Sequence, residues 1–181
     1  INNVIAARSR YKSLSELLQD SSNLTPSEIS ENAIPLLLKS NGIGELIENF
    51  NIFKSMWPII YKVVPTSVDS IITFIIDTFN RDCNYYIQFQ DTETIACMAV
   101  LLCPLTNVPD FKIALFDLAL TNAINANRWD ALRNIYNNII LKWDKDTILP
   151  YTTYIHDNKE KLSMLSQAID VKIPSIVTNY Y

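Results

Sequence analysis

The sequence contains very little glycine. Gly42 and Gly44 are the only two glycines in 181 residues, whereas an average protein of this length has about a dozen. Tight β-hairpin turns need positive φ angles, which glycine, asparagine and aspartate adopt most readily. No Asn-Gly or Asp-Gly pair lies between alternating apolar and polar runs, and the single Asn41-Gly42 pair follows a helical run, where it is typical of a helix C-cap. The sequence therefore argues against a β-sheet protein.

Histidine is almost absent, which removes most catalytic and metal chemistry. His156 is the single histidine, so a metal site built on a histidine pair is excluded, and a Ser/His/Asp or Cys/His centre would depend on one residue. It stands just before an expected helix start, where a solvated or N-terminal role is ordinary. The sequence shows no partner that would position it as a general base. We therefore expect no enzyme, and no catalytic residue, cofactor or metal ion.

Cysteines are few and odd in number. The three cysteines are Cys83, Cys97 and Cys103. An odd number of cysteines in a chain of this length is unsuited to a framework of disulfide bonds. The last two are six residues apart, a spacing that puts them on different faces of a helix and fits neither a redox pair nor a zinc knuckle. We expect them to behave as small buried apolar residues. An intracellular location, in the cytoplasm or nucleus, is the simplest inference.

The sequence has no excess of positive charge and no long apolar run. The formal net charge is −4, so phosphate groups and anionic lipid find no surplus of lysine and arginine. No apolar run reaches the ~18–20 residues that span a bilayer. We therefore expect no nucleic-acid partner and no membrane insertion. The chain opens at Ile1 instead of a methionine, from which we expect a segment of a longer protein.

What the sequence does contain is helical periodicity. Hydrophobic residues make up 49% of the chain and charged residues 19%, a balance that supports one folded domain over residues 1–181. The clearest apolar stripe follows the spacing of one helix face and consists of Val68, Ile71, Ile72, Ile75, Ile76 and Phe79. Thr66 is the expected N-cap of this helix, with Asp69 three residues later.

A hairpin of two helices is expected further along the chain. The first helix covers residues 110–124, and the second carries an apolar stripe over residues 129–143. Only residues 125–128 join them, and so short a connection places consecutive helices antiparallel and side by side. Trp129 and Trp143 both lie on the stripe, so we expect both in the core.

Weaker signals of the same kind fill the rest of the chain. A first helix is expected over residues 4–18, and Thr25 to Glu28 has the pattern of a capping box with proline at the first helical position. That helix should kink or break near Pro35. About ten helices are expected, without a fixed repeat. The predicted fold is all-α, with antiparallel helical hairpins stacked as an irregular bundle or as a short solenoid of the HEAT or TPR kind.

Two motifs that could suggest ligand sites have ordinary explanations. Gly42-Ile43-Gly44 resembles the beginning of a phosphate loop, but Ile47 occupies the position of the third glycine. It is better explained as a helix C-cap followed by the next helix start. Asp144 and Asp146 lie at a helix boundary, where capping and the helix dipole favour acidic residues.

The C-terminal segment, about the last 20 residues, has the pattern of a helix-turn-helix. Leu162, Leu165 and Ile169 form one helix face, Val171 is an apolar residue in the turn, and Pro174 begins a second helix. This pattern resembles the middle helices of the winged-helix subdomain that follows helical repeats in PCI-domain scaffold proteins. The resemblance implies a scaffold subunit, and an ordinary helical hairpin is the alternative. The second helix offers no lysine or arginine to read DNA.

Three aromatic residues fall outside any helical pattern. Tyr85, Tyr86 and Phe89 lie in the connection over residues 81–90. Such a group either packs down as a satellite cluster or is offered to a partner. The three are therefore the candidate partner-binding residues.

These observations lead to three hypotheses. The first is a non-catalytic protein–protein interaction or scaffold module that belongs to a larger protein complex. The second is a helical domain that encloses an apolar small molecule or lipid. The third is the helical part of a PCI-like scaffold subunit with a partial winged-helix end.

Overall fold

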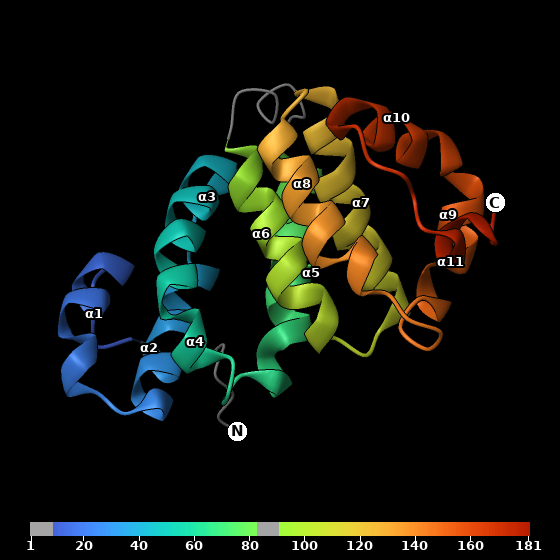
Figure 1. Ribbon diagram of the computed structural model, residues 1–181. Helices are drawn as coiled ribbons and strands as arrows, with labels where there is room; N and C mark the ends of the chain where they lie inside the picture. Colours follow the sequence, from blue (N-terminus) through green and yellow to red (C-terminus); the bar gives the residue numbers. More distant parts are fainter. Residues whose placement is uncertain (1–8, 83–90) are drawn as a thin grey trace. The chain divides into compact units, whose positions relative to one another are not determined.

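The computed structural model describes residues 9–82 and 91–181, and every regular element within them is a helix (Figure 1). The prediction of an all-α protein with about ten helices is confirmed. The α-helices are α1 Leu14–Asp20, α2 Pro26–Leu38, α3 Gly42–Phe53, α4 Trp57–Ile60, α5 Val68–Arg81, α6 Thr92–Leu102, α7 Pro109–Asn125, α8 Trp129–Asn138, α9 Thr152–Asp157, α10 Lys159–Ile169 and α11 Ser175–Thr178.

The helices group into two compact units. The first is Ile1–Cys83 and the second is Asn84–Tyr181. Both the single domain over residues 1–181 and the stacking of hairpins as a bundle or solenoid stay predictions. Each unit is described by itself below.

The first unit is built around α2, which contacts α1, α3, α4 and α5. Its N-terminus has the expected capping box: the Glu28 amide donates to the Thr25 hydroxyl at 3.2 Å, and the Thr25 amide donates to the Glu28 carboxylate at 2.9 Å. The expected break near Pro35 does not occur, because α2 continues through this residue to Leu38. The neighbours of α2 in the unit bury the proline within the helix.

The start of α3 corrects one expectation about glycine. Gly42 is not a C-cap but the first residue of α3, with φ +87°. The Ile43 amide donates to a carboxylate oxygen of Asp82 at 2.9 Å, and a Cβ at Gly42 would lie 3.2 Å from that same oxygen. Glycine is therefore required by conformation and by space. The carboxylate that follows α5 caps α3 from 39 residues away in the sequence.

Two other helix starts differ from expectation. The first helix begins at Leu14, because Ser13 has extended backbone and accepts a hydrogen bond from the Glu16 amide at 3.1 Å. Residues 9–13 are not helical. α5 begins at Val68 after the 3-10 turn Pro65–Ser67, and its N-cap is Ser67 instead of Thr66. The five members of its predicted stripe other than Ile76 are buried.

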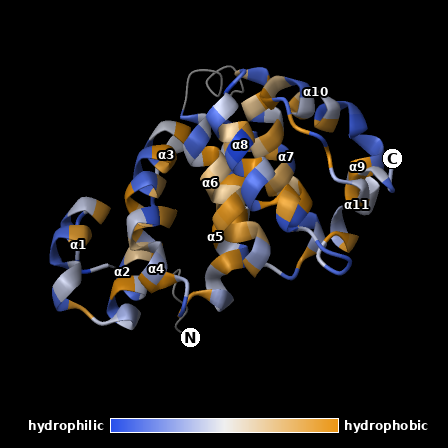
Figure 2. Ribbon diagram, viewed as in Figure 1, coloured by the Kyte–Doolittle hydropathy of each residue, from blue (hydrophilic) through white to orange (hydrophobic). Residues whose placement is uncertain are grey.

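In the second unit α6, α7 and α8 contact one another, and α10 contacts α7 and α8. α6 is apolar along most of its length, as its colouring in Figure 2 shows, because it is covered by both α7 and α8. α7 and α8 form the expected αα-hairpin. In their connection Asn127 has φ 51°, and the Arg128 amide donates to the Ala123 carbonyl at 3.0 Å.

The second helix of the hairpin is shorter than predicted. α8 ends at Asn138, and Ile139 leaves the helical conformation before the 3-10 turn Ile140–Lys142. Trp143 therefore follows the helix, and it is buried as expected. Its ring centroid lies 5.5 Å from that of Phe116 on α7 and 4.6 Å from that of Tyr151. This aromatic cluster attaches the segment after α8 to α7.

Candidate functional site

The three aromatics chosen from the sequence, Tyr85, Tyr86 and Phe89, lie outside the described residues. They stay a prediction. The segment that contains them directly precedes Asp91, the N-cap of α6.

Trp129 is the described residue whose position differs most from expectation. It was expected in the core, but 54% of its side chain is exposed. The buried residues of α8 are Ala131, Leu132, Ile135 and Tyr136. At about 100° per residue, Trp129 lies roughly 90° around the helix from the centre of that face. The apolar stripe predicted from the sequence includes residues at the edge of the buried face. Trp129 is such an edge residue, and the described residues of the unit leave about half of its side chain uncovered.

Trp129 lines a hollow of about 420 Å³ on the surface of the second unit. The hollow lies where α6 and α8 begin. Its lining consists of Asp91, Thr92, Glu93, Asn127, Arg128, Trp129 and Asp130. The described lining contains three carboxylates and one guanidinium, so negative charge prevails among these residues.

The carboxylates of this acidic hollow have different local roles. Asp91 caps α6 by accepting hydrogen bonds from the Glu93 and Thr94 amides at 3.1 and 3.2 Å. Asp130 lies 3.8 Å from Arg133 one turn along α8. Glu93 is exposed on the first turn of α6. All three carboxylate residues are exposed, and Asp91 is held in place by the amides that it caps.

The second unit also contains an apolar pocket of about 220 Å³. It lies between the N-terminal turn of α7 and the segment that follows α8. Its lining consists of Cys103, Pro104, Lys112, Asn138, Ile139, Lys142, Trp143, Thr147 and Tyr151. The residues come from three stretches of sequence, so no local motif could have predicted the pocket.

The thiol and the phenol in this apolar pocket stay neutral near pH 7. Burial raises the pKa of Cys103 to about 12, and the Lys112 ammonium and a hydrogen bond with Tyr151 lower it only in part. Burial is also the main cause that raises the pKa of Tyr151, and the Cys103 thiol adds to it. Cys103 was expected to be buried, and it is. Cys97 is only half-buried, and Cys83 lies outside the described residues.

Polar contacts also tie α7 to α9 and α10. One carboxylate oxygen of Asp117 accepts from the Tyr154 hydroxyl at 2.6 Å, from the Lys161 ammonium at 2.8 Å and from Thr121 at 3.1 Å. Burial by itself would raise the pKa of Asp117, but the hydrogen bonds from Lys161 and Tyr154 outweigh it and lower the pKa. All partners are satisfied within the unit. We interpret this cluster as structural.

His156 lies in the last turn of α9, shortly before α10 begins at Lys159, as expected. Its Nδ1 is 2.7 Å from the main-chain oxygen of Tyr181. Within residues 9–82 and 91–181, no three His, Cys, Asp or Glu side chains are grouped so that they could hold a metal ion. Asp144 accepts from the Asp146 and Thr147 amides at 2.9 Å, which is a turn contact.

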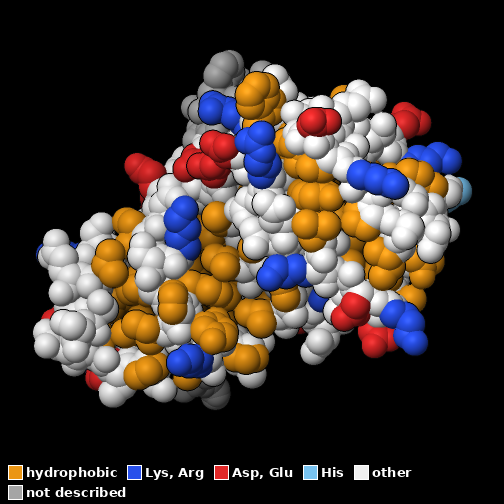
Figure 3. Space-filling view, viewed as in Figure 1, with side chains coloured by type: hydrophobic (Ala, Val, Ile, Leu, Met, Phe, Trp, Pro, Cys, Tyr) orange, Lys and Arg blue, Asp and Glu red, His pale blue; other side chains and the backbone are white. Residues whose placement is uncertain are grey.

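Hydrophobic side chains are also exposed in the first unit. Figure 3 shows such side chains on the face that carries α4, and the exposed members on α4 and the turn after it are Ile59, Tyr61 and Val63. Exposed Lys62 lies between Tyr61 and Val63 in the sequence, and this single charge does not indicate what would cover the patch. This patch therefore gives less information about a partner than the acidic hollow does.

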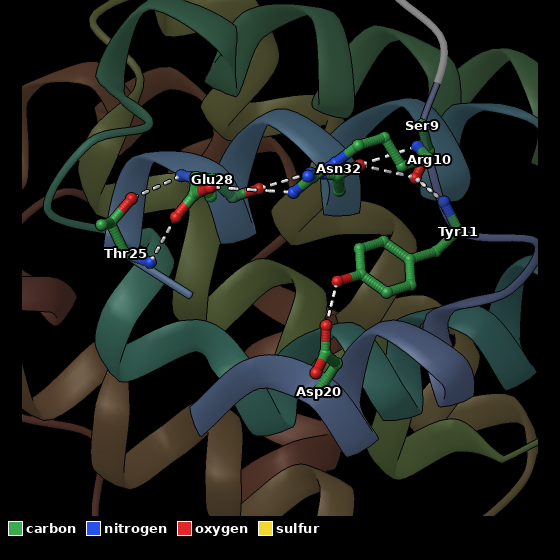
Figure 4. A network of polar contacts seen from close by, with 7 residues as sticks. All are labelled: Ser9, Arg10, Tyr11, Asp20, Thr25, Glu28 and Asn32. Atoms are coloured by element: carbon green, nitrogen blue, oxygen red, sulfur yellow. Dashed lines mark hydrogen bonds and ion pairs between the residues drawn. The ribbon is translucent and has the colours of Figure 1, made fainter. Parts of the chain in front are cut away.

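The densest polar network of the first unit anchors the segment before α1 (Figure 4). Buried Asn32 accepts from the Ser9 hydroxyl at 3.0 Å and the Arg10 amide at 2.9 Å, and it donates to the Glu28 carbonyl at 2.7 Å. Tyr11 donates to the Asp20 carboxylate. These groups bind one another, so the network explains how residues 9–11 are held and offers no open site.

The C-terminal helices do not decide between the two interpretations made from the sequence. α10 ends at Ile169, its C-cap Asp170 has a left-handed φ of 54°, and α11 begins at Ser175. The Tyr136 hydroxyl of α8 donates to the Lys172 carbonyl at 2.9 Å, which holds the connection. The relation to a winged helix stays a prediction.

Comparison of the chain with protein-family models, with curated proteins and with solved structures finds no match. None of the helices in the described parts of the chain is long and apolar enough to cross a membrane.

Proposed function

We propose that this chain is a non-catalytic protein–protein interaction module, and that the acidic hollow binds a basic segment of another protein. The observation that carries the proposal is Trp129, whose indole is exposed beside three carboxylates. Tryptophan and arginine are the residue types most often found at the energetic centre of protein interfaces. A helical scaffold with an aromatic contact residue is consistent with a subunit of a larger assembly.

The charge of the hollow determines the chemistry of the partner. A lysine or arginine side chain can lie on the face of an indole, an attraction of about 0.5–2 kcal/mol. The neighbouring Asp91, Glu93 and Asp130 carboxylates favour the same cation. Arg128 disfavours a long run of basic residues. We therefore expect one basic side chain in an otherwise neutral extended segment.

The test uses the full chain and a set of fluorescent peptides. Neutral ten-residue peptides that carry one central arginine or lysine are compared with peptides that carry norleucine or glutamate at the same position, and fluorescence anisotropy measures the affinity. The arginine and lysine peptides should bind more tightly. Trp129→Leu keeps an apolar side chain but removes the aromatic face, and should weaken their binding by about 3-fold to 30-fold.

Met164→Ala is the matched control, because Met164 is 53% exposed on α10 of the same unit and does not line the hollow. It should leave peptide binding unchanged. In cells, quantitative affinity purification should show a set of proteins that Trp129→Leu loses and Met164→Ala retains. Equal affinity of the two variants for the basic peptides, or a preference for the glutamate peptide, would contradict the proposal.

A further inference from the structure

The apolar pocket beside Trp143 has a composition that the interaction function does not explain. Its walls are apolar or aromatic, with Pro104, Ile139, Trp143 and Tyr151 among them. Trp143 and Tyr151 are fixed against each other and against Phe116, whose ring centroid is 5.5 Å from each. Such a preformed apolar cavity with a few polar groups is typical of a small-molecule site.

The charged groups that line this pocket are two lysines. The Lys112 ammonium is half-buried and donates to the Cys103 carbonyl at 2.8 Å. Lys142 is exposed at the rim. In the parts of the chain that the structure describes, no carboxylate pairs with either ammonium group. The carboxylate next to the pocket is that of Asp144, which accepts from the Thr147 hydroxyl at 3.1 Å and is not among the lining residues.

The half-buried ammonium is the group that indicates a ligand. Burial lowers the pKa of Lys112, which means that the charged form is disfavoured where it lies. A neutral carbonyl occupies one of its three hydrogen-bond donors, and an anion could take the others. The Cys103 thiol and the Tyr151 phenol, which are both neutral near pH 7, would not repel an anion.

The volume limits the size of the ligand. Sites for drug-sized molecules measure about 300–1,000 Å³, whereas this pocket measures about 220 Å³. Its space suits one aromatic ring or a short branched chain. A bulky lipid would not fit.

We propose that this pocket binds a small monocarboxylic acid, with its carboxylate on Lys112 and Lys142 and its single ring or short branched chain against Trp143 and Tyr151. The site is separate from the acidic hollow, and its lining shares no residue with it. It gives a specific form to the hypothesis of a helical domain that encloses a small molecule: the protein senses or carries a small organic acid as well as binding a protein.

Three compounds of nearly equal shape test the role of the charge. Phenylacetate, phenylacetamide and phenethylamine are titrated into the full chain, and binding is followed by calorimetry and by the indole signals in two-dimensional NMR spectra. Phenylacetate should bind with a Kd on the order of 1 mM, because its few atoms limit the affinity. The amide should bind at least about 10-fold more weakly, and the amine should not bind.

Variants then locate the site. Lys112→Met keeps the apolar stem and should weaken phenylacetate binding by about 10-fold. Lys145→Met is the control, because Lys145 is an exposed lysine of the same segment that does not line the pocket. Asn138→Trp, at an exposed position on the rim, should block entry without disturbing the core.

Each outcome supports or overturns the inference. Equal binding of the acid and the amide, or equal binding of phenylacetate by the Lys112→Met and Lys145→Met proteins, would show that the pocket does not select a carboxylate. The expected Kd of phenylacetate is on the order of 1 mM. If phenylacetate well above that concentration gave neither a calorimetric heat of binding nor a shift of the indole NMR signals, the proposed site would be overturned. Trp129→Leu should leave phenylacetate binding unchanged, so this proposal and the proposed function fail independently.

Discussion

The two hollows of the second unit differ in charge, in volume and in the residues that form their walls. The acidic hollow lies at two helix starts, is lined mostly by exposed polar side chains and displays an exposed indole. The apolar pocket lies against an aromatic cluster and carries two ammonium groups. Polar helix starts suit a contact surface for a protein, whereas a fixed aromatic wall suits a small molecule. One helical unit can therefore offer two kinds of recognition.

The largest expected effect is a difference in alkylation rate between a buried cysteine and a more accessible one. Cys103 lines the apolar pocket, is 1% exposed and has a pKa of about 12, whereas an ordinary thiol has a pKa of about 8.5. At pH 8 its alkylation by iodoacetamide should be slower than in the unfolded chain by about 1,000-fold or more. Half-buried Cys97 should react faster than Cys103.

The measurement is the rate of carbamidomethylation at each cysteine, obtained by mass spectrometry of peptides after timed quenching. The same protein in denaturant supplies the reference rates. If Cys103 in the native protein were alkylated as fast as Cys97, the wall of the apolar pocket would be open to solvent, which would contradict the burial of Cys103.

Removal of the ring behind the apolar pocket should destabilise the protein strongly. Phe116 is fully buried and contacts Trp143, Tyr151 and Tyr154. Phe116→Ala should lower the free energy of unfolding by about 3–5 kcal/mol, as measured by urea denaturation. Trp129→Ala removes an aromatic ring of the acidic hollow, and should change it by less than about 0.5 kcal/mol. Similar losses for the two variants would contradict the assignment of one ring to the core and the other to the surface.

The carboxylate that joins α7 to α10 should make stability depend on pH. The pKa of Asp117 is lowered in the folded protein, because hydrogen bonds from Lys161 and Tyr154 outweigh the effect of burial. The contribution of Asp117 to the free energy of unfolding is therefore complete above the pKa of about 3.9 that it has in the unfolded chain. This contribution is lost as the pH falls through the lower pKa of the folded protein. Asp117→Asn should cost about 1 kcal/mol near pH 7, since the group is partly exposed.

Thermal unfolding between neutral pH and the acid range checks this prediction. The Asp117→Asn protein should show a smaller decrease of Tm on acidification than the unsubstituted chain. Asp110→Asn is the control, because Asp110 is exposed in the first turn of the same helix. If Asp117→Asn and Asp110→Asn changed the dependence of Tm on pH equally, the role of Asp117 in joining α7 to α10 would be contradicted.

Substitution of a buried amide on α7 should have the smallest effect, and it should stabilise the protein where the substitutions above destabilise it. Asn122 is 5% exposed, and its Nδ2 has no hydrogen-bond partner in the described residues. Asn122→Leu removes the unpaired donor and keeps the number and branching of the side-chain heavy atoms, and should raise the free energy of unfolding by up to about 1 kcal/mol. Asn122→Asp keeps the shape but adds charge and should lower it. A destabilised leucine variant would indicate a partner for this amide.

The sequence predicted the elements better than their ends. The stripe of residues 68–79 predicted α5, and the capping box at Thr25 predicted the start of α2, because both signals are local. The starts of α1 and α3 were missed. The first depends on Ser13 capping a short helix, and the second on a carboxylate of Asp82 that lies far away in the sequence.

The sites were less predictable than the helices. Trp129 and Trp143 have the same apolar spacing, yet 54% of the first side chain is exposed and 8% of the second. A signal was present, because Trp129 lies at the edge of the buried face of α8. The apolar pocket had none, since Cys103, Lys112 and Tyr151 are brought together only by folding.

The sequence by itself determined the helical class and left His156 as the single histidine of the chain. Helical spacing depends on residues three or four apart, and scarcity of glycine and histidine can be counted directly. Tertiary structure alone decided which aromatic rings are covered and where two lysines meet an apolar wall. Burial of a side chain depends on residues distant in the chain, so a one-dimensional pattern identifies the face of a helix but not what lies against it.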